Sequence, residues 1–282
     1  MPNLLKWDIE GERYYETGVD RGVLYRKNSS GSEYENGVVW NGLTSVSQSP
    51  SGAEETKLYA DNVKYLSLYS AEEFGGTIEA YTYPDEWAVC DGSAYLDDAG
   101  AVYIGQQTRR GFGFSYRTKK GNDQNPDLGY LIHIVYNAKA SPSERSYATV
   151  NDSPEAITFS WEFTTTPVSF GEDFKPSAML IIDTTKLDPS VLTEIEEKLY
   201  GKAGSDGTKI SDAELPSPEW IIAKVASAPT YVAVSKTGTG YSSKNPSTEG
   251  WYERSGVSEP YTYTLSADTE VDQEKTYYEL SS

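Results

Sequence analysis

Short segments of alternating apolar and polar residues, separated by Gly, Asn, Asp and Pro, run through most of this sequence. The clearest is Ala156–Thr166, in which Phe159, Trp161 and Phe163 alternate with polar residues. Val63–Tyr69 shows the same period of two, with Leu66 and Leu68 on either side of a serine. Alternation of this kind is typical of strands with one buried face. The pattern therefore predicts a mainly β fold built from antiparallel sheets.

One stretch near residue 190 has a helical pattern instead. Asp188 is a favourable N-cap, and Pro189 follows at the first helical position, where its missing N–H costs nothing. Leu192, Ile195 and Leu199 are spaced to form one apolar stripe. The sequence thus predicts a single amphipathic helix, lying on a β structure and ending before Gly201.

The composition changes after this helix. Gly201–Pro218 is rich in glycine and charge and reads as a flexible connection. Glu219–Val225 is expected to return to the main body as an edge strand. We therefore divide the 282 residues into a main domain, 1–225, and a small appended β module, 226–282.

Charge and rare residues exclude several classes of function. The net charge of −19 disfavours binding to DNA phosphates and to anionic membranes. Cys90 is the only cysteine, and His133 is the only histidine. These counts exclude an internal disulfide, a zinc site with several Cys or His ligands, and most triad chemistry. No apolar run reaches the ~20 residues of a membrane helix, and no signal peptide is evident at the start, so we expect a cytoplasmic protein.

The sequence motifs of common enzymes are missing. There is no GxxxxGK[ST], GxSxG or HExxH pattern. Acidic pairs such as Asp97-Asp98 and Glu54-Glu55 would suit a glycoside hydrolase, but with 43 acidic residues they are best read as solvated loop charge. We therefore expect no enzymatic activity, no cofactor and no metal site.

The aromatic residues allow a further interpretation. Tyr81, Tyr83, Trp87 and Tyr95 lie close together in sequence and could form a platform on which sugars stack. They could equally form packed pairs that compensate for a core poor in aliphatic residues. We favour packing, and keep a carbohydrate-binding or adhesin module as the alternative function.

Residues 1–225 as a whole resemble the major tail tube proteins of long-tailed bacteriophages and prophages of Gram-positive bacteria. The resemblance is carried, in order, by Thr17–Tyr25, Val39–Ser51, Gly52–Asn62, Tyr65–Asp91, Ile104–Tyr116, Gly129–Tyr136, Val150–Val168, Phe174–Asp183 and the helix ending at Leu199-Tyr200-Gly201. It implies two packed antiparallel β-sheets, a sandwich or barrel-like fold, flanked by one α-helix.

The same resemblance implies a structural role in the virion tail, assembled in the host cytoplasm. Family members form six-fold rings that stack into a hollow tube, through which DNA passes. The implied partners are other copies of the chain, the tape measure protein inside the tube, and the tail terminator and distal tail proteins. An acidic lumen suits this task, since a basic one would retain DNA.

Two surfaces follow as candidate sites. The polar segment 47–62 exceeds an ordinary hairpin turn of about 2–5 residues, so we expect a protruding loop or hairpin that contacts the next ring. The candidate residues for this contact are Ser47, Pro50, Gly52, Glu54, Glu55, Lys57, Tyr59, Asp61 and Asn62. In the appended module, Trp251 and Tyr252 are candidates for contact with host-surface sugars.

Overall fold

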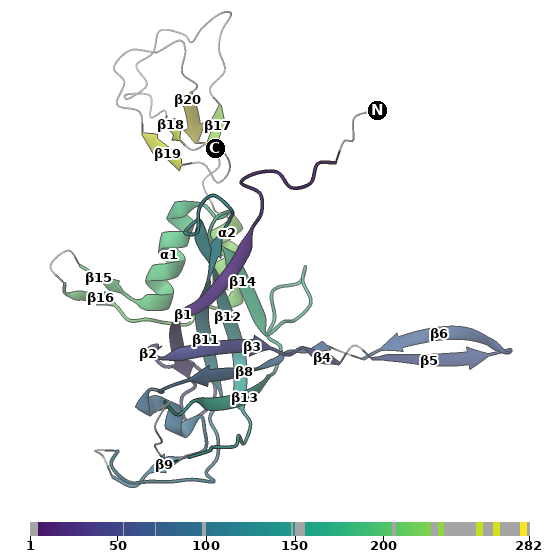
Figure 1. Ribbon diagram of the computed structural model, residues 1–282, viewed down its shortest axis with the longest axis vertical. Helices are drawn as coiled ribbons and strands as arrows, with labels where there is room; N and C mark the ends of the chain where they lie inside the picture. Colours follow the sequence, from purple (N-terminus) through teal and green to yellow (C-terminus); the bar gives the residue numbers. More distant parts are fainter. Residues whose placement is uncertain are drawn as a thin grey trace, which may run out of the picture.

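The computed structural model describes residues 5–52, 54–70, 72–97, 100–147, 149, 156–204, 207–226, 231–233, 252–255, 262–265 and 277–280. The fold is mainly β, with 44% of the described residues in strands and 12% in helices (Figure 1). This confirms the fold class expected from the alternating segments.

A large antiparallel sheet forms the body. It contains β1 (Tyr15–Arg26), β2 (Val38–Trp40), β3 (Leu43–Gln48), β8 (Gly75–Ala80), β11 (Phe112–Gly121), β12 (Gly129–Ala140), β13 (Phe159–Thr165) and β14 (Met179–Asp183). The strand order is β2-β1-β11-β12-β13-β8-β3, and β14 also pairs with β12. Strand β12 pairs with β14 through residues 131–135 and with β13 through residues 138–140. The sheet therefore divides at β12 into two halves.

The two halves enclose one core, and helices cover a second. Leu24, Phe114 and Val135, on one face of the central strands, pack with residues of β8 and β13 such as Ile78 and Trp161. Residues on the opposite face of the same central strands pack under the helices; they are Val23, Tyr25, Ile132, Ile134 and Tyr136. Both faces of the central strands are thus buried. The expected pair of packed sheets is formed by one sheet folded upon itself.

Helix α1 (Pro189–Tyr200) begins as its sequence predicts. The Asp188 carboxylate accepts a hydrogen bond of 2.8 Å from the backbone N–H of Ser190. Ile195 and Leu199 are fully buried. Gly201 follows with a φ of 81°, a value that favours glycine.

The predicted edge strand at 219–225 is wrong. These residues form a second helix, α2 (Pro218–Ala226), so more than one helix flanks the sheet. Pro218 occupies the first helical position, and the Ser217 hydroxyl accepts a hydrogen bond of 3.2 Å from the Trp220 N–H. Ile221 and Val225 lie one turn apart, and Ile221 packs into the core under α1. A short apolar run fits either period, and packing against α1 selects the helix.

The remaining elements are short. They are the 3-10 helix η1 (Asp85–Val89) and the strand pairs β9 (Ala94–Tyr95) with β10 (Tyr103–Ile104), β15 (Lys202–Ala203) with β16 (Lys209–Ser211), β4 (Ser51–Gly52) with β7 (Glu72–Glu73), and β5 (Glu55–Ala60) with β6 (Val63–Tyr69). Part of the connection expected at 201–218 is therefore a short strand pair. In the described part of the C-terminal region, β17 (Tyr231–Ala233), β18 (Tyr252–Ser255), β19 (Thr262–Leu265) and β20 (Tyr277–Leu280) form a sheet in the order β17-β20-β18-β19.

Candidate assembly surface

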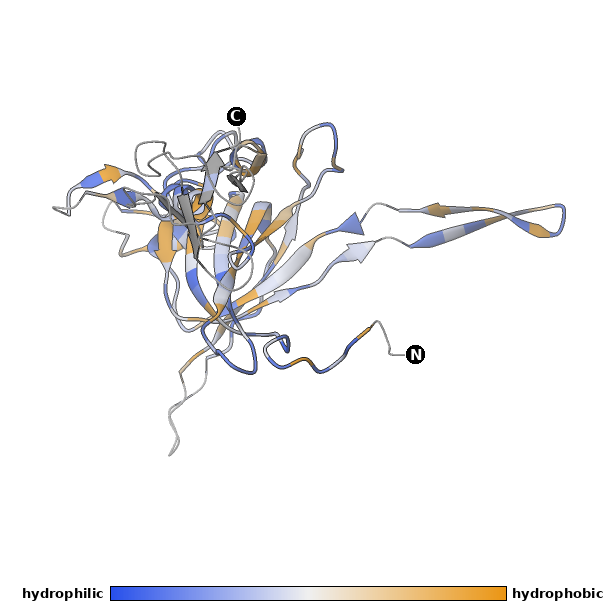
Figure 2. Ribbon diagram, turned by 90° about the horizontal axis from the view of Figure 1, so that it is seen from above, coloured by the Kyte–Doolittle hydropathy of each residue, from blue (hydrophilic) through white to orange (hydrophobic). Residues whose placement is uncertain are grey.

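A long hairpin extends away from the body, and Figures 1 and 2 show it from two directions. It leaves the sheet where β3 meets β8; there the Ser49 N–H donates a hydrogen bond of 2.8 Å to the Gly75 carbonyl. The β4–β7 pair follows, with Ser51 opposite Glu73. Beyond it, β5 and β6 pair from Glu55 and Tyr69 to the tip. The expected protruding segment 47–62 is therefore one arm of a hairpin whose second arm is β6.

Two non-glycine residues with positive φ make the turn at the tip. Asp61 has a φ of 51° and Asn62 a φ of 63°. Positive φ at both central residues defines the type I′ turn, whose twist matches that of the flanking strands. Asp and Asn tolerate this left-handed conformation better than most residues. The polar pair at the end of the candidate segment thus serves to close the hairpin.

The other candidate residues lie along the same projection. Ser47 is in β3 opposite Thr77, and Pro50 joins β3 to β4. Gly52 in β4 has a φ of 87°, which favours glycine. The Glu54 backbone N–H donates a hydrogen bond of 3.0 Å to the Ser70 hydroxyl of the other arm, and Tyr59 is exposed.

One face of the hairpin carries its charged groups, which pair with one another beside Tyr59 and Tyr69. The Glu55 carboxylate accepts hydrogen bonds from Lys64 and from the Ser67 hydroxyl, and Lys57 lies 3.5 Å away. The hydrogen bond from Lys64, followed by that from Ser67, lowers the pKa of Glu55 below its usual range. The Glu55 carboxylate therefore stays ionised, and the charged groups on this face pair with one another.

The opposite face is apolar, as the alternation of Leu66 and Leu68 indicated, but sequence reasoning missed that it is exposed. In the pairing register Leu58 lies opposite Leu66 and Thr56 opposite Leu68, so these side chains share a face. Val63, opposite Ala60 beyond a register shift, extends it toward the tip. Leu58, Leu66 and Leu68 are between 42% and 49% exposed. The alternation at 63–69 predicted a buried face, but no element of the described body covers it.

The residues suggested for sugar stacking do not form a platform. Trp87 is fully buried and lies 4.7 Å, between ring centroids, from Trp40. Tyr83 packs edge-on against Trp161 at 5.4 Å. The Tyr95 hydroxyl donates to the Asp85 carbonyl, and Tyr81 is exposed. Trp87 and Tyr83 therefore belong to the core, as the favoured interpretation held, whereas Tyr95 and Tyr81 lie outside both core clusters.

His133 and Cys90, the single histidine and the single cysteine, are both buried. His133 is buried and stacks on Tyr116, with its Nε2 2.9 Å from the Thr118 hydroxyl. Burial lowers the pKa of His133, while the nearby Glu16 charge opposes this shift. Cys90 is fully buried, and burial raises the pKa of its thiol to about 12. Such a thiol is not an activated nucleophile.

Within the described residues, no group of three His, Cys, Asp or Glu is arranged to hold a metal ion. In the described part of the chain, neither helix α1 nor helix α2 is long enough to span a membrane. Tyr252 is the first residue of β18, and Trp251 lies outside the described residues.

No family model and no curated protein matches this sequence. Among solved structures, the chain is similar to one in "Cryo-EM Structure of an Extracellular Contractile Injection System, PVC sheath-tube complex in extended state". The two are 12% identical, the match covers 57% of this chain and 88% of that one, and the TM-score is 0.25.

Proposed function

We propose that this chain is a phage major tail tube protein of the siphovirus type, whose copies form six-fold rings that stack into the DNA-conducting tail tube. Its function is self-assembly in the host cytoplasm, without a catalytic step, a cofactor or a metal. The sequence resemblance to the tail tube proteins of bacteriophages and prophages of Gram-positive bacteria covers residues 1–225 and implies this function. The projecting hairpin is the structural observation that supports it.

An isolated two-stranded hairpin is marginal in water unless it packs against something. Strands β5 and β6 expose both faces, including Leu58 and Leu66. A polar projection would need no partner, but an apolar one gains stability only when it is covered. A contact with the next ring supplies that cover, and the hairpin then acts as the stacking element.

Free sheet edges support lateral assembly within a ring. Among the described strands, β2 pairs only with β1, β3 only with β8, and β14 only with β12. Each therefore carries a row of backbone groups without a strand partner on its outer side, which is a template for pairing with another chain. Strand pairing between neighbouring copies closes the ring without leaving these edges open.

The negative charge of the chain determines the conditions under which the tube assembles and how its interior interacts with DNA. At −19 per copy, neighbouring subunits repel one another, so added salt promotes assembly by screening. The same charge keeps DNA from binding as it passes through. The tape measure protein fills the lumen before ejection, and terminator and distal tail proteins close the ends.

Deletion of the hairpin tests the proposal. Because Gly52 lies opposite Glu72, residues 53–71 can be replaced by a two-residue Asn-Gly turn that closes β4 onto β7. Negative-stain microscopy in assembly-promoting salt should show tubes for the native chain and only rings or single subunits for the deletion. Circular dichroism checks that the body of the deletion variant stays folded.

Two results contradict the proposal. A native chain that stays monomeric by light scattering at high concentration in such salt is not a tube subunit. If the deletion variant still forms tubes, the hairpin is not the element that stacks the rings. A native monomer that binds glycan arrays would instead favour the adhesin alternative.

A further inference from the structure

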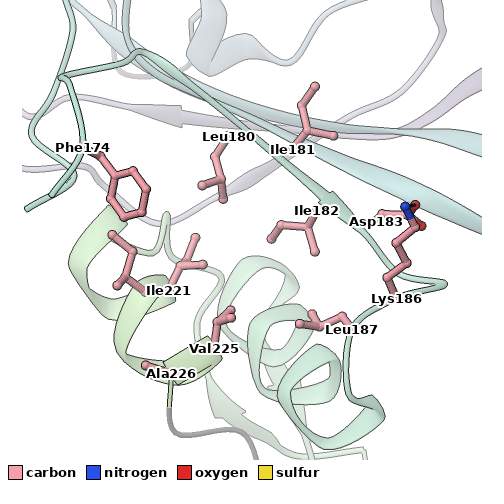
Figure 3. A pocket seen from close by; sticks show the side chains of 11 residues that line it. Phe174, Leu180, Ile181, Ile182, Asp183, Lys186, Leu187, Ile221, Val225 and Ala226 are labelled. Carbon is pink, nitrogen blue, oxygen red and sulfur yellow. Dashed lines mark ion pairs between the residues drawn. The ribbon is translucent and has the colours of Figure 1, made fainter. Parts of the chain in front are cut away.

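A second apolar surface lies on the body, between β14 and α2. The groove there has a volume of about 500 Å³, and Figure 3 shows Leu180 and Ile182 of β14 on one wall and Ile221 and Val225 of α2 on the other. Phe174 reaches over one end. Phe174 is 63% exposed and Val225 is 46% exposed. A contiguous exposed patch of this kind marks an interaction site.

Charged groups of the groove are confined to one end. Asp183 and Lys186 lie there, with Lys186 Nζ 3.9 Å from the Asp183 carboxylate. Asp183 also accepts a hydrogen bond of 2.5 Å from Lys120, so its charge is neutralised locally. The rest of the lining is aliphatic or aromatic, in a chain with a net charge of −19.

We propose that this groove receives the apolar face of the β5–β6 hairpin of a second copy of the chain. The inference rests on the proposed function and names the docking surface of the stacking contact. The apolar face of the hairpin and most of the groove carry no charge, on a molecule whose copies otherwise repel each other. Contact through Leu58, Leu66 and Leu68 removes apolar area from water without bringing carboxylates together.

The occupant has to be another copy, because the chain's own hairpin points away from its own body (Figures 1 and 2). The hairpin and the groove are different surfaces, so their contact is heterologous. A heterologous contact leaves a free groove and a free hairpin at the two ends, and each end accepts a further copy. Such a contact propagates along a tube.

Crosslinking between copies tests this contact. The native thiol, Cys90, is fully buried, so introduced cysteines react selectively. Chains carrying Leu66→Cys are mixed with chains carrying Val225→Cys, assembled, and treated with a short bismaleimide. A covalent dimer should form in the mixture but not with either chain alone. Lys57→Cys, on the face of the same hairpin that carries its charged groups, is the matched control and should give at least tenfold less dimer.

A groove variant gives an independent measurement. Val225→Glu places a charge on a groove side chain that is 46% exposed, so the subunit should fold with an unchanged melting temperature. It should reduce tube yield at least tenfold, whereas Ile104→Glu, on the distant β10, should not. Rescue of Val225→Glu by Leu66→Lys would add support.

The outcomes separate the two proposals. Tubes with a selective 66–225 crosslink support both. Tubes without that crosslink, or with equal crosslinking from position 57, overturn the docking site and leave the tube function standing. A crosslinked closed dimer that never forms tubes supports the docking and overturns the tube function. Absence of both assembly and crosslink overturns both, and undiminished tubes from Val225→Glu overturn the docking.

Discussion

The hydroxyl of Tyr25 donates a hydrogen bond of 2.6 Å to the backbone carbonyl of Leu199. Tyr25 lies in β1 and Leu199 in the last turn of α1, and both are fully buried. The last carbonyls of a helix have no partner within the helix. One tyrosine of the central sheet therefore satisfies the end of the helix that covers it, and fixes α1 against the sheet.

Removing this hydroxyl should destabilise the main domain. Tyr25→Phe leaves a buried carbonyl without its donor, which costs about 1–3 kcal/mol. Urea denaturation should show this loss in the free energy of unfolding. Tyr81→Phe, at an exposed tyrosine, is the control and should change stability by less than about 0.5 kcal/mol. Equal stability of the two variants would show that the Tyr25–Leu199 hydrogen bond contributes nothing.

A methyl group at Gly76 should displace the root of the hairpin. Gly76 in β8 lies opposite Gln48, and a Cβ there would lie 2.2 Å from the Ser47 carbonyl oxygen. Gly76→Ala should therefore separate β3 from β8 and reduce both stability and tube yield. Gly105→Ala, where a Cβ meets nothing within 4 Å, should leave both unchanged. Normal assembly of Gly76→Ala would refute this account of the root.

The turn at the tip should tolerate glycine and reject a β-branched residue. Asn62 has a φ of 63°, so Asn62→Gly should keep the hairpin, whereas Asn62→Val costs about 1–2 kcal/mol in the left-handed region. Hydrogen exchange of the β5 and β6 amides measures the difference. Faster exchange in Asn62→Val than in Asn62→Gly is expected, and identical exchange would argue against a type I′ turn.

Burial of His133 should make stability depend on pH below neutrality. Its pKa in the folded protein lies below the usual value near 6.5, because burial disfavours the imidazolium. As pH falls below about 6.5, the unfolded chain binds a proton that the folded chain does not, so stability decreases until the folded pKa is reached. His133→Gln should flatten the slope of the unfolding free energy against pH below about pH 6.5. If the native chain and His133→Gln show the same slope, groups other than His133 cause the pH dependence.

The C-terminal region should be dispensable for assembly. The two core clusters of the described residues contain nothing beyond Ile222, and β17–β20 pair only with one another among the described strands. Truncation after Ala226, which keeps α2 whole, should leave tube formation in micrographs unchanged. Loss of tubes after this truncation would place the C-terminal region in the assembly contact.

Local signals in the sequence determined much of this fold. The alternation at 159–163 predicted a strand with Trp161 and Phe163 buried, and the structure has it. Asp188 and Pro189 marked the start of α1, because an N-cap and a first-turn proline act on neighbouring backbone groups alone. Such features depend on residues a few positions apart, so the sequence is enough to find them.

Only the tertiary structure decided which apolar faces are covered within the subunit. Leu66 and Leu68 have the same alternation as Trp161 and Phe163, yet they lie on an exposed hairpin. Periodicity gives the direction of a side chain but not what packs against it, since that depends on pairing partners distant in the chain. The same reason explains 219–225, where packing beneath α1 selected a helix. The groove beside β14 likewise exists only because α2 lies next to that strand.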